Sequence, residues 1–154
     1  MRIAVAADHA GFLIKDEVIN LLQASGQDVI DLGTYNQEPV DYPDYALKIG
    51  KAIQDKQADR GVLICGSGVG ACIAANKIKG IYASVCHDTY SAHQGVEHDN
   101  MNVLCLGSRI VGIELVKEIV KAFITAEFST EERFRRRLEK VYELEAYGKI
   151  NTHK

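Results

Sequence analysis

The sequence predicts an α/β fold of three layers, in which a five-stranded parallel sheet lies between helices in a Rossmann-like arrangement, with a C-terminal helical extension. Short apolar runs of strand length alternate with longer stretches of helical periodicity, as in β-α units. The central runs are apolar without alternation, as expected for strands that helices cover on both faces. The chain has 154 residues, and we expect a single domain over 1–154.

Each expected strand leads into an expected helix. The first helix carries Val18, Leu21 and Leu22 on one face and stops at Gly26. A polar loop follows the second strand, and Asp44 is expected to cap the second helix. The expected strands are 3–6, 29–32, 62–64, 82–85 and 103–106, and the expected helices are 12–24, one from Asp44 through Ile53, 71–77, 90–97 and 110–126.

The end of the chain departs from this alternation. A helix is expected over 131–147, inside a C-terminal segment 130–148, and no strand follows it. Its apolar residues include Phe134 and Leu138, while Arg133 and Arg137 lie four residues apart on a neighbouring face. Such a helix either covers the core or forms a dimer arm, and the pattern leaves both interpretations open.

The composition excludes several classes of protein. A formal net charge of -3 argues against nucleic acid or an acidic membrane surface as a partner, since both require a broad basic face. No apolar run approaches the roughly 20 residues of a membrane span. The N-terminus enters a strand without a signal-peptide pattern, so we expect a cytoplasmic protein with free thiols. The cysteines, which lack paired metal-type spacing, are Cys65, Cys72, Cys86 and Cys105.

The strand expected over 62–64 ends at Cys65 and continues into a glycine-rich loop. Such a strand-to-helix turn exposes backbone N–H groups, which stabilise anions and favour the thiolate of a nearby cysteine. Cys65 would lie at the carboxyl edge of the sheet, where open α/β sheets bind ligands, as a base or nucleophile. The competing interpretation is a small core residue. The loop residues are Gly66, Ser67, Gly68, Val69 and Gly70.

Polar residues follow other strands at the same predicted edge. Asp8 and His9 follow the first strand and 87–88 follow the fourth, so they can converge on Cys65. Each has a structural alternative: Asp8 as a cap of the first helix, His9 as an exposed turn residue and 87–88 as a helix start. The polar residues 98–100, which precede the last strand, can likewise form an ordinary turn.

Three other chemistries fit the sequence poorly. The histidine spacings do not place two rings on one helical face as a zinc helix does. Ser67 lacks the Gly-x-Ser-x-Gly pattern of a hydrolase, and the dinucleotide fingerprint is absent.

Several separated motifs resemble ribose-5-phosphate isomerase type B in order and spacing. The family also includes galactose-6-phosphate and allose-6-phosphate isomerases, which these motifs do not separate. The likeness covers nearly the whole chain. The motifs are 8–12 with Lys15, 31–35, 40–46, 65–70 with 74–77, His98 with 102–104, 107–109, and the terminal Arg133 and Arg137.

The resemblance implies an aldose-ketose isomerase that needs neither metal nor organic cofactor. Cys65 matches the general base that moves a proton between C1 and C2 of the open-chain sugar through an enediolate. The loop from Gly66 to Gly70 would be the anion hole. Ser67 would relay protons between the oxygens, and His98 would open the sugar ring.

The resemblance also assigns binding roles. Asp8 and Tyr42 would bind sugar hydroxyls, and the phosphate would be held by His9, Arg109, Arg133 and Arg137. In this family the site lies between two subunits, with His98 and the tail arginines coming from the partner. The resemblance therefore implies that 130–148 reaches the partner subunit of a homodimer or a dimer of dimers.

Three departures from the family pattern bear on these roles. Asp99 stands where the family usually has an asparagine, which would place a charge at a substrate contact. Phe134 replaces a histidine, and 130–132 replace a glycine pair, so the tail arginines form either a phosphate site or a solvated helix face.

We therefore expect interconversion of ribose 5-phosphate and ribulose 5-phosphate. The alternatives are the same reaction on allose 6-phosphate or galactose 6-phosphate, and a non-catalytic module that binds a sugar phosphate.

Overall fold

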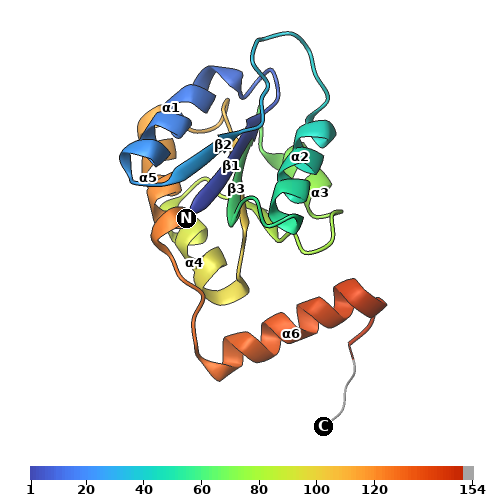
Figure 1. The fold of residues 1–154 in the computed structure, drawn as a ribbon. Coiled ribbons are helices and arrows are strands. Elements are labelled where there is room, and N and C mark those ends of the chain that lie inside the picture. Colours follow the sequence, from blue (N-terminus) through green and yellow to red (C-terminus); the bar gives the residue numbers. More distant parts are fainter. Residues whose placement is uncertain (151–154) are drawn as a thin grey trace.

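The computed structural model describes residues 1–150 and contains a five-stranded parallel sheet, as the sequence predicted (Figure 1). Residues 151–154, the end of the expected domain, lie outside the described residues. The spatial order of the strands is β2-β1-β3-β5-β4, and all the pairs are parallel. The strands are β1 (Arg2–Ala7), β2 (Asp28–Asp31), β3 (Arg60–Cys65), β4 (Ala83–Val85) and β5 (Val103–Gly107).

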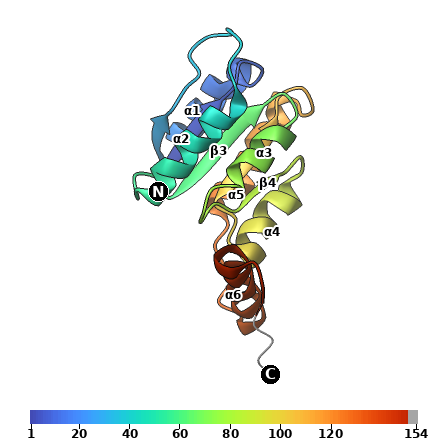
Figure 2. The same cartoon turned by 90° about the vertical axis from the view of Figure 1, so that its right-hand side faces the viewer.

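Helices cover both faces of this sheet, which confirms the three layers (Figures 1 and 2). Within β1, Ile3 and Val5 pack with the helices of one face, while Ala4 and Ala6 pack with those of the other. This double burial is why the strands are apolar without alternation. One layer contains α1 (Phe12–Ala24), α4 (Thr89–Asp99) and α5 (Ile113–Thr125), and the other contains α2 (Tyr42–Gln54) and α3 (Val69–Ala75).

The starts of three helices differ from the sequence prediction by two residues or more. α2 begins at Tyr42, so the expectation that Asp44 caps it was wrong; Pro43 occupies its first turn, where no backbone N–H is needed. α3 begins at Val69, directly after Gly68. α5 begins at Ile113, three residues late, because the preceding segment forms a turn on Gly107.

The C-terminal helix α6 (Glu132–Tyr147) is only partly packed. Phe134 and Leu138 are buried, whereas Val141 and Tyr142 are each at least 40% exposed. Figures 1 and 2 show α6 beyond the end of the sheet at which the strands begin, next to α4. Among the described residues, no helix is long and apolar enough to span a bilayer.

Candidate active site

Cys65 ends β3 at the carboxyl edge of the sheet and is 5% exposed. The backbone N–H of Gly68 donates to its Sγ atom at 3.0 Å. Gly68 has a φ of +82°, and a Cβ at this position would lie 3.1 Å from Val85 Cγ1. Only glycine adopts this turn without strain, and the turn aims the N–H at the sulfur. The glycine-rich turn thus directs a backbone N–H at the candidate base.

The segment after β5 is hydrogen-bonded to the start of the glycine-rich loop. The N–H of Ser108 donates to the carbonyl oxygen of Cys65 at 2.8 Å, and the N–H of Arg109 donates to that of Gly66 at 3.0 Å. The Arg109 guanidinium lies against Gly66. A Cβ added to Gly66 would be 3.6 Å from the guanidinium carbon. A cation therefore lies beside the loop that follows the thiol.

Asp8 and His9 lie at the end of β1, next to this loop. Asp8 Oδ1 accepts from the N–H groups of Ala10 and Gly11 at 2.9 and 3.0 Å and so holds the turn before α1. The alternative that Asp8 caps this helix was wrong, because the N-cap is Gly11 and no side chain caps it. The Asp8 side chain also lines the cavity beside Cys65. His9 Nδ1 accepts from the N–H of Val40 at 3.2 Å, which leaves Nε2 to carry the proton of the neutral ring.

These side chains surround a cavity of about 430 Å³, a size that suits a small ligand. Tyr42 closes one side, with its ring packed so closely on Gly70 that a Cβ there would lie 2.9 Å from Cζ. The predicted convergence of strand ends on Cys65 is thus confirmed for Asp8 and His9. The lining residues are Asp8, His9, Ala10, Tyr42, Cys65, Gly66, Ser67, Gly70, Arg109 and Ile110.

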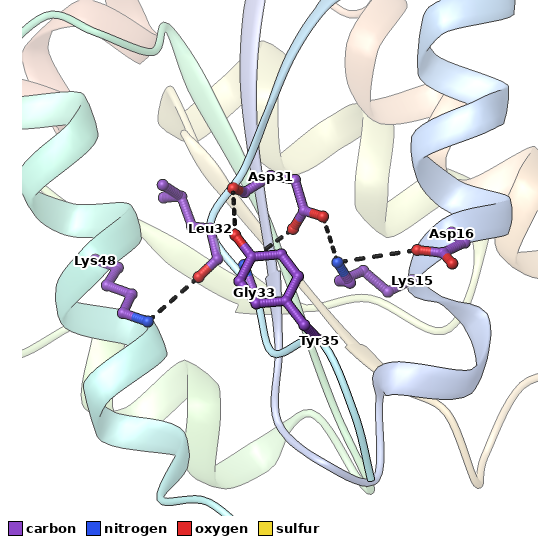
Figure 3. A network of polar contacts seen from close by, with 7 residues as sticks. All are labelled: Lys15, Asp16, Asp31, Leu32, Gly33, Tyr35 and Lys48. Atoms are coloured by element: carbon purple, nitrogen blue, oxygen red, sulfur yellow. Dashed lines mark hydrogen bonds and ion pairs between the residues drawn. The ribbon is translucent and has the colours of Figure 1, made fainter.

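A partly buried ion pair joins α1 to the end of β2 (Figure 3). Lys15 is 1% exposed, and its Nζ lies 2.5 Å from Asp31 Oδ2. Asp31 Oδ1 accepts from the N–H of Gly33 at 2.9 Å, and Tyr35 donates its hydroxyl to the Asp31 carbonyl. The network fixes the start of the β2–α2 connection, whose later residues include Val40. We assign Lys15 to positioning, since it does not line the cavity.

None of the three other cysteines lines the Cys65 cavity. The pKa of Cys72 falls to about 7, chiefly because the Cys105 thiol donates a hydrogen bond to it. The same bond, together with burial, raises the pKa of Cys105 well above its ordinary value. Burial raises the pKa of Cys86 to about 11. Cys72 is therefore the more acidic member of the Cys72–Cys105 pair.

The remaining predicted residues form a second group on α4 and α6. His98, in the last turn of α4, stacks on Phe134 with the ring centroids 4.0 Å apart and an interplanar angle of 16°. The guanidinium groups of Arg133 and Arg137 lie 4.4 and 6.0 Å from the centroid of Phe134. None of these residues lines the Cys65 cavity of its own chain. Asp99 lines a different cavity, between α4 and β4.

The expectation that 87–88 joins the Cys65 site was wrong. Asp88 caps α4 by accepting from the N–H of Ser91 at 2.7 Å, and the N–H groups at this helix start lower its pKa. Neither His87 nor Asp88 lines the cavity. Across residues 1–150, no group of three or more potential metal ligands was found.

Two neighbours of His98 were not predicted from the sequence. Gln94 Nε2 lies 2.8 Å from His98 Nδ1, and Glu97 Oε2 lies 3.6 Å from His98 Nε2. Gln94 precedes His98 by four residues, so the helical spacing alone could have identified this pair.

Comparison with known proteins decides the family. The model of the Ribose/Galactose Isomerase family matches residues 3–141. The chain belongs to this family. The isomerase is 47% identical over 127 residues to ribose-5-phosphate isomerase B of Escherichia coli K12, covering 82% of this chain and 85% of that protein.

Two further relatives of the isomerase bear on the reaction. D-erythrulose-4-phosphate isomerase of Pectobacterium atrosepticum is 43% identical over 132 residues, covering 83% of this chain and 85% of that protein. The crystal structure of ribose-5-phosphate isomerase B from Mycoplasma genitalium, with bound ribulose-5-phosphate, superposes with a TM-score of 0.88 at 38% identity. That comparison covers 95% of this chain and 97% of the other. The chain is thus an aldose-ketose isomerase.

Proposed function

We propose that this isomerase interconverts ribose 5-phosphate and ribulose 5-phosphate, with Cys65 as the general base. The observation that carries the proposal is the hydrogen bond from the Gly68 N–H to Cys65 Sγ, in a cavity that Asp8 and Arg109 also line. It combines a sulfur atom that accepts a backbone N–H with groups that bind hydroxyls and phosphate. The names of the relatives support the same substrates.

The first step opens the sugar ring. The C1–O4 bond breaks as C1 and O1 form the aldehyde, O1 loses its proton, and O4 gains one. His98 is proposed to carry this proton, because imidazole exchanges protons near neutral pH.

Isomerisation then proceeds through the enediolate. The Cys65 thiolate takes the proton from C2, the C–H electron pair forms the C1–C2 double bond, and O1 becomes negatively charged. N–H groups of the loop from Gly66 to Gly70 would stabilise this charge. Ser67 relays the O2 proton to O1, and the Cys65 thiol returns its proton to C1, which leaves a carbonyl at C2.

The substrate contacts follow from the cavity lining. Asp8, whose Oδ1 is engaged in the turn, retains Oδ2 for a sugar hydroxyl, and the Tyr42 hydroxyl provides a second contact. His9 Nε2–H and Arg109 would donate to the phosphate.

A second copy of the chain is proposed to complete this site. His98, Arg133 and Arg137 lie outside the Cys65 cavity of their own chain, and α6 leaves apolar residues exposed. Two copies in a symmetric dimer would each supply this group to the other's cavity.

The test is turnover of ribose 5-phosphate in buffer with EDTA, native against Cys65→Ala. We expect Cys65→Ala to lower kcat by about 10²–10⁴-fold, the usual contribution of a general base. Binding of ribulose 5-phosphate, measured by calorimetry, should persist. Unchanged turnover in Cys65→Ala would contradict the role of Cys65, and absence of native turnover would contradict the substrate assignment.

D-erythrulose 4-phosphate is the second candidate substrate, because a relative 43% identical to this chain bears that name. Allose 6-phosphate and galactose 6-phosphate are the six-carbon alternatives. Comparing kcat/KM for all four sugars separates them, and we expect ribose 5-phosphate to give the highest value.

A further inference from the structure

His98 is held on two sides by residues that have no place in the mechanism above. Gln94 contacts an edge of the imidazole through Nδ1, and Phe134 covers one of its faces. One contact comes from the same helix and the other from α6. The inference drawn from them rests on the proposed function, since it concerns the residue that opens the sugar ring.

The contact with Gln94 fixes which ring nitrogen carries the proton. Gln94 Nε2 lies 2.8 Å from His98 Nδ1. Because an amide nitrogen donates and does not accept, Nδ1 is the acceptor and the neutral ring carries its proton on Nε2. Nε2 faces Glu97 Oε2 at 3.6 Å, and the imidazole side chain is 28% exposed. Nε2 is therefore the nitrogen that remains for a substrate.

The contact with Phe134 fixes the plane of the imidazole. Phe134 is 3% exposed, and its near-parallel stack leaves His98 little freedom to rotate. The guanidinium groups of Arg133 and Arg137 lie close to the same phenyl ring. One side chain thus sets the position of the imidazole relative to both arginines.

We propose that Gln94 and Phe134 are positioning residues for His98, with Gln94 holding the Nε2–H form and Phe134 holding the ring plane. Neither touches the sugar, and both act through the imidazole. Removing either side chain should slow ring opening, because the imidazole would no longer be held in position to transfer the proton.

Double-mutant cycles test whether the two residues act through His98. Gln94→Leu and Phe134→Leu should each lower kcat for ribose 5-phosphate about tenfold, with KM little changed in Gln94→Leu. In a His98→Asn background neither should lower kcat further. Phe134→His, which keeps an aromatic ring for the stack, should restore most of kcat, and Gln23→Leu, an exposed glutamine on α1, serves as the control.

Nitrogen-15 NMR of the histidines gives a readout that needs no turnover. The His98 signals, identified by their loss in His98→Asn, should show the Nε2–H form in the native protein. In Gln94→Glu a carboxylate faces Nδ1, accepts from it, and should shift the ring to the Nδ1–H form.

The outcomes separate this inference from the proposed function. A native protein inactive on ribose 5-phosphate contradicts the proposed function and the kinetic half of the inference. An active protein in which both losses persist in the His98→Asn background contradicts the inference alone, as does a native His98 in the Nδ1–H form. The inference is supported if Gln94→Leu and Phe134→Leu lower kcat only when His98 is present and Gln94→Glu shifts the ring to the Nδ1–H form.

Discussion

The two groups of candidate site residues are built differently. The Cys65 group lies on loops at the carboxyl edge of the sheet, where backbone hydrogen bonds hold it and Cys65 and Asp8 are at most 7% exposed. The His98 group lies on α4 and α6, where side-chain contacts hold it and the Arg133 side chain is 58% exposed. One chain thus provides the buried Cys65 group at one end of the sheet and the more exposed His98 group at the other.

Gly68→Ala should produce the largest effect, because it disturbs the rigid group at its centre. An alanine at φ +82° is strained by about 1–3 kcal/mol and crowds Val85. The turn would no longer aim its N–H at Cys65, and we expect kcat to fall by at least about 100-fold. The measurement is kcat together with the free energy of unfolding. Native kcat in this variant would contradict the claim that catalysis requires the glycine turn at residue 68.

Arg137→Ala should affect binding more than chemistry, which distinguishes the second group from the first. Loss of a charge-assisted hydrogen bond to phosphate costs about 1.5–3 kcal/mol, which corresponds to a rise in KM of about 10–150-fold. Arg135→Ala, on the same helix, is the matched control and should leave KM unchanged. Equal effects of the two variants would favour the solvated-face interpretation.

Lys15→Met tests the support beneath the Cys65 group. Removing one partner of a buried ion pair costs about 3–5 kcal/mol, and because the Asp31 side chain is 33% exposed we expect about 1–3 kcal/mol. Urea unfolding measures this loss. Lys117→Met, which removes ion pairs with the exposed carboxylates of Glu17 and Glu114, should change stability little. A Lys15 variant as stable as the native protein would contradict the claim that this ion pair stabilises the β2–α2 connection.

Alkylation of Cys72 should change activity least, since no catalytic role is assigned to it. Its pKa of about 7 means that the thiolate accumulates as pH rises through 7, so its alkylation rate should increase about tenfold between pH 6 and pH 8. Cys86, with a pKa of about 11, should stay nearly unreactive over this range. Peptide mass spectrometry after iodoacetamide treatment separates the sites. Equal rates at Cys72 and Cys86 would contradict the assignment.

The sequence predicted the sheet, its layers and the Cys65 loop, because these depend on local patterns. An apolar run, a cysteine and three spaced glycines determine their own conformation with little help from distant residues. The start of α2 was missed, since Pro43 is tolerated in a first turn and gives no clear boundary. The exclusion of His87 and the stack of His98 on Phe134 depend on how distant elements pack. Periodicity in one sequence does not contain that information.

The most direct test of the two-group arrangement is complementation between two impaired variants. Cys65→Ala and His98→Asn chains, co-expressed with different tags and purified as the mixed species, place an intact Cys65 on one copy and an intact His98 on the other. If the site forms between copies, one of the two sites in each mixed dimer is intact, and we expect about half of native turnover of ribose 5-phosphate. Turnover no higher than that of the separate variants would contradict a shared site and require His98 to act within its own chain.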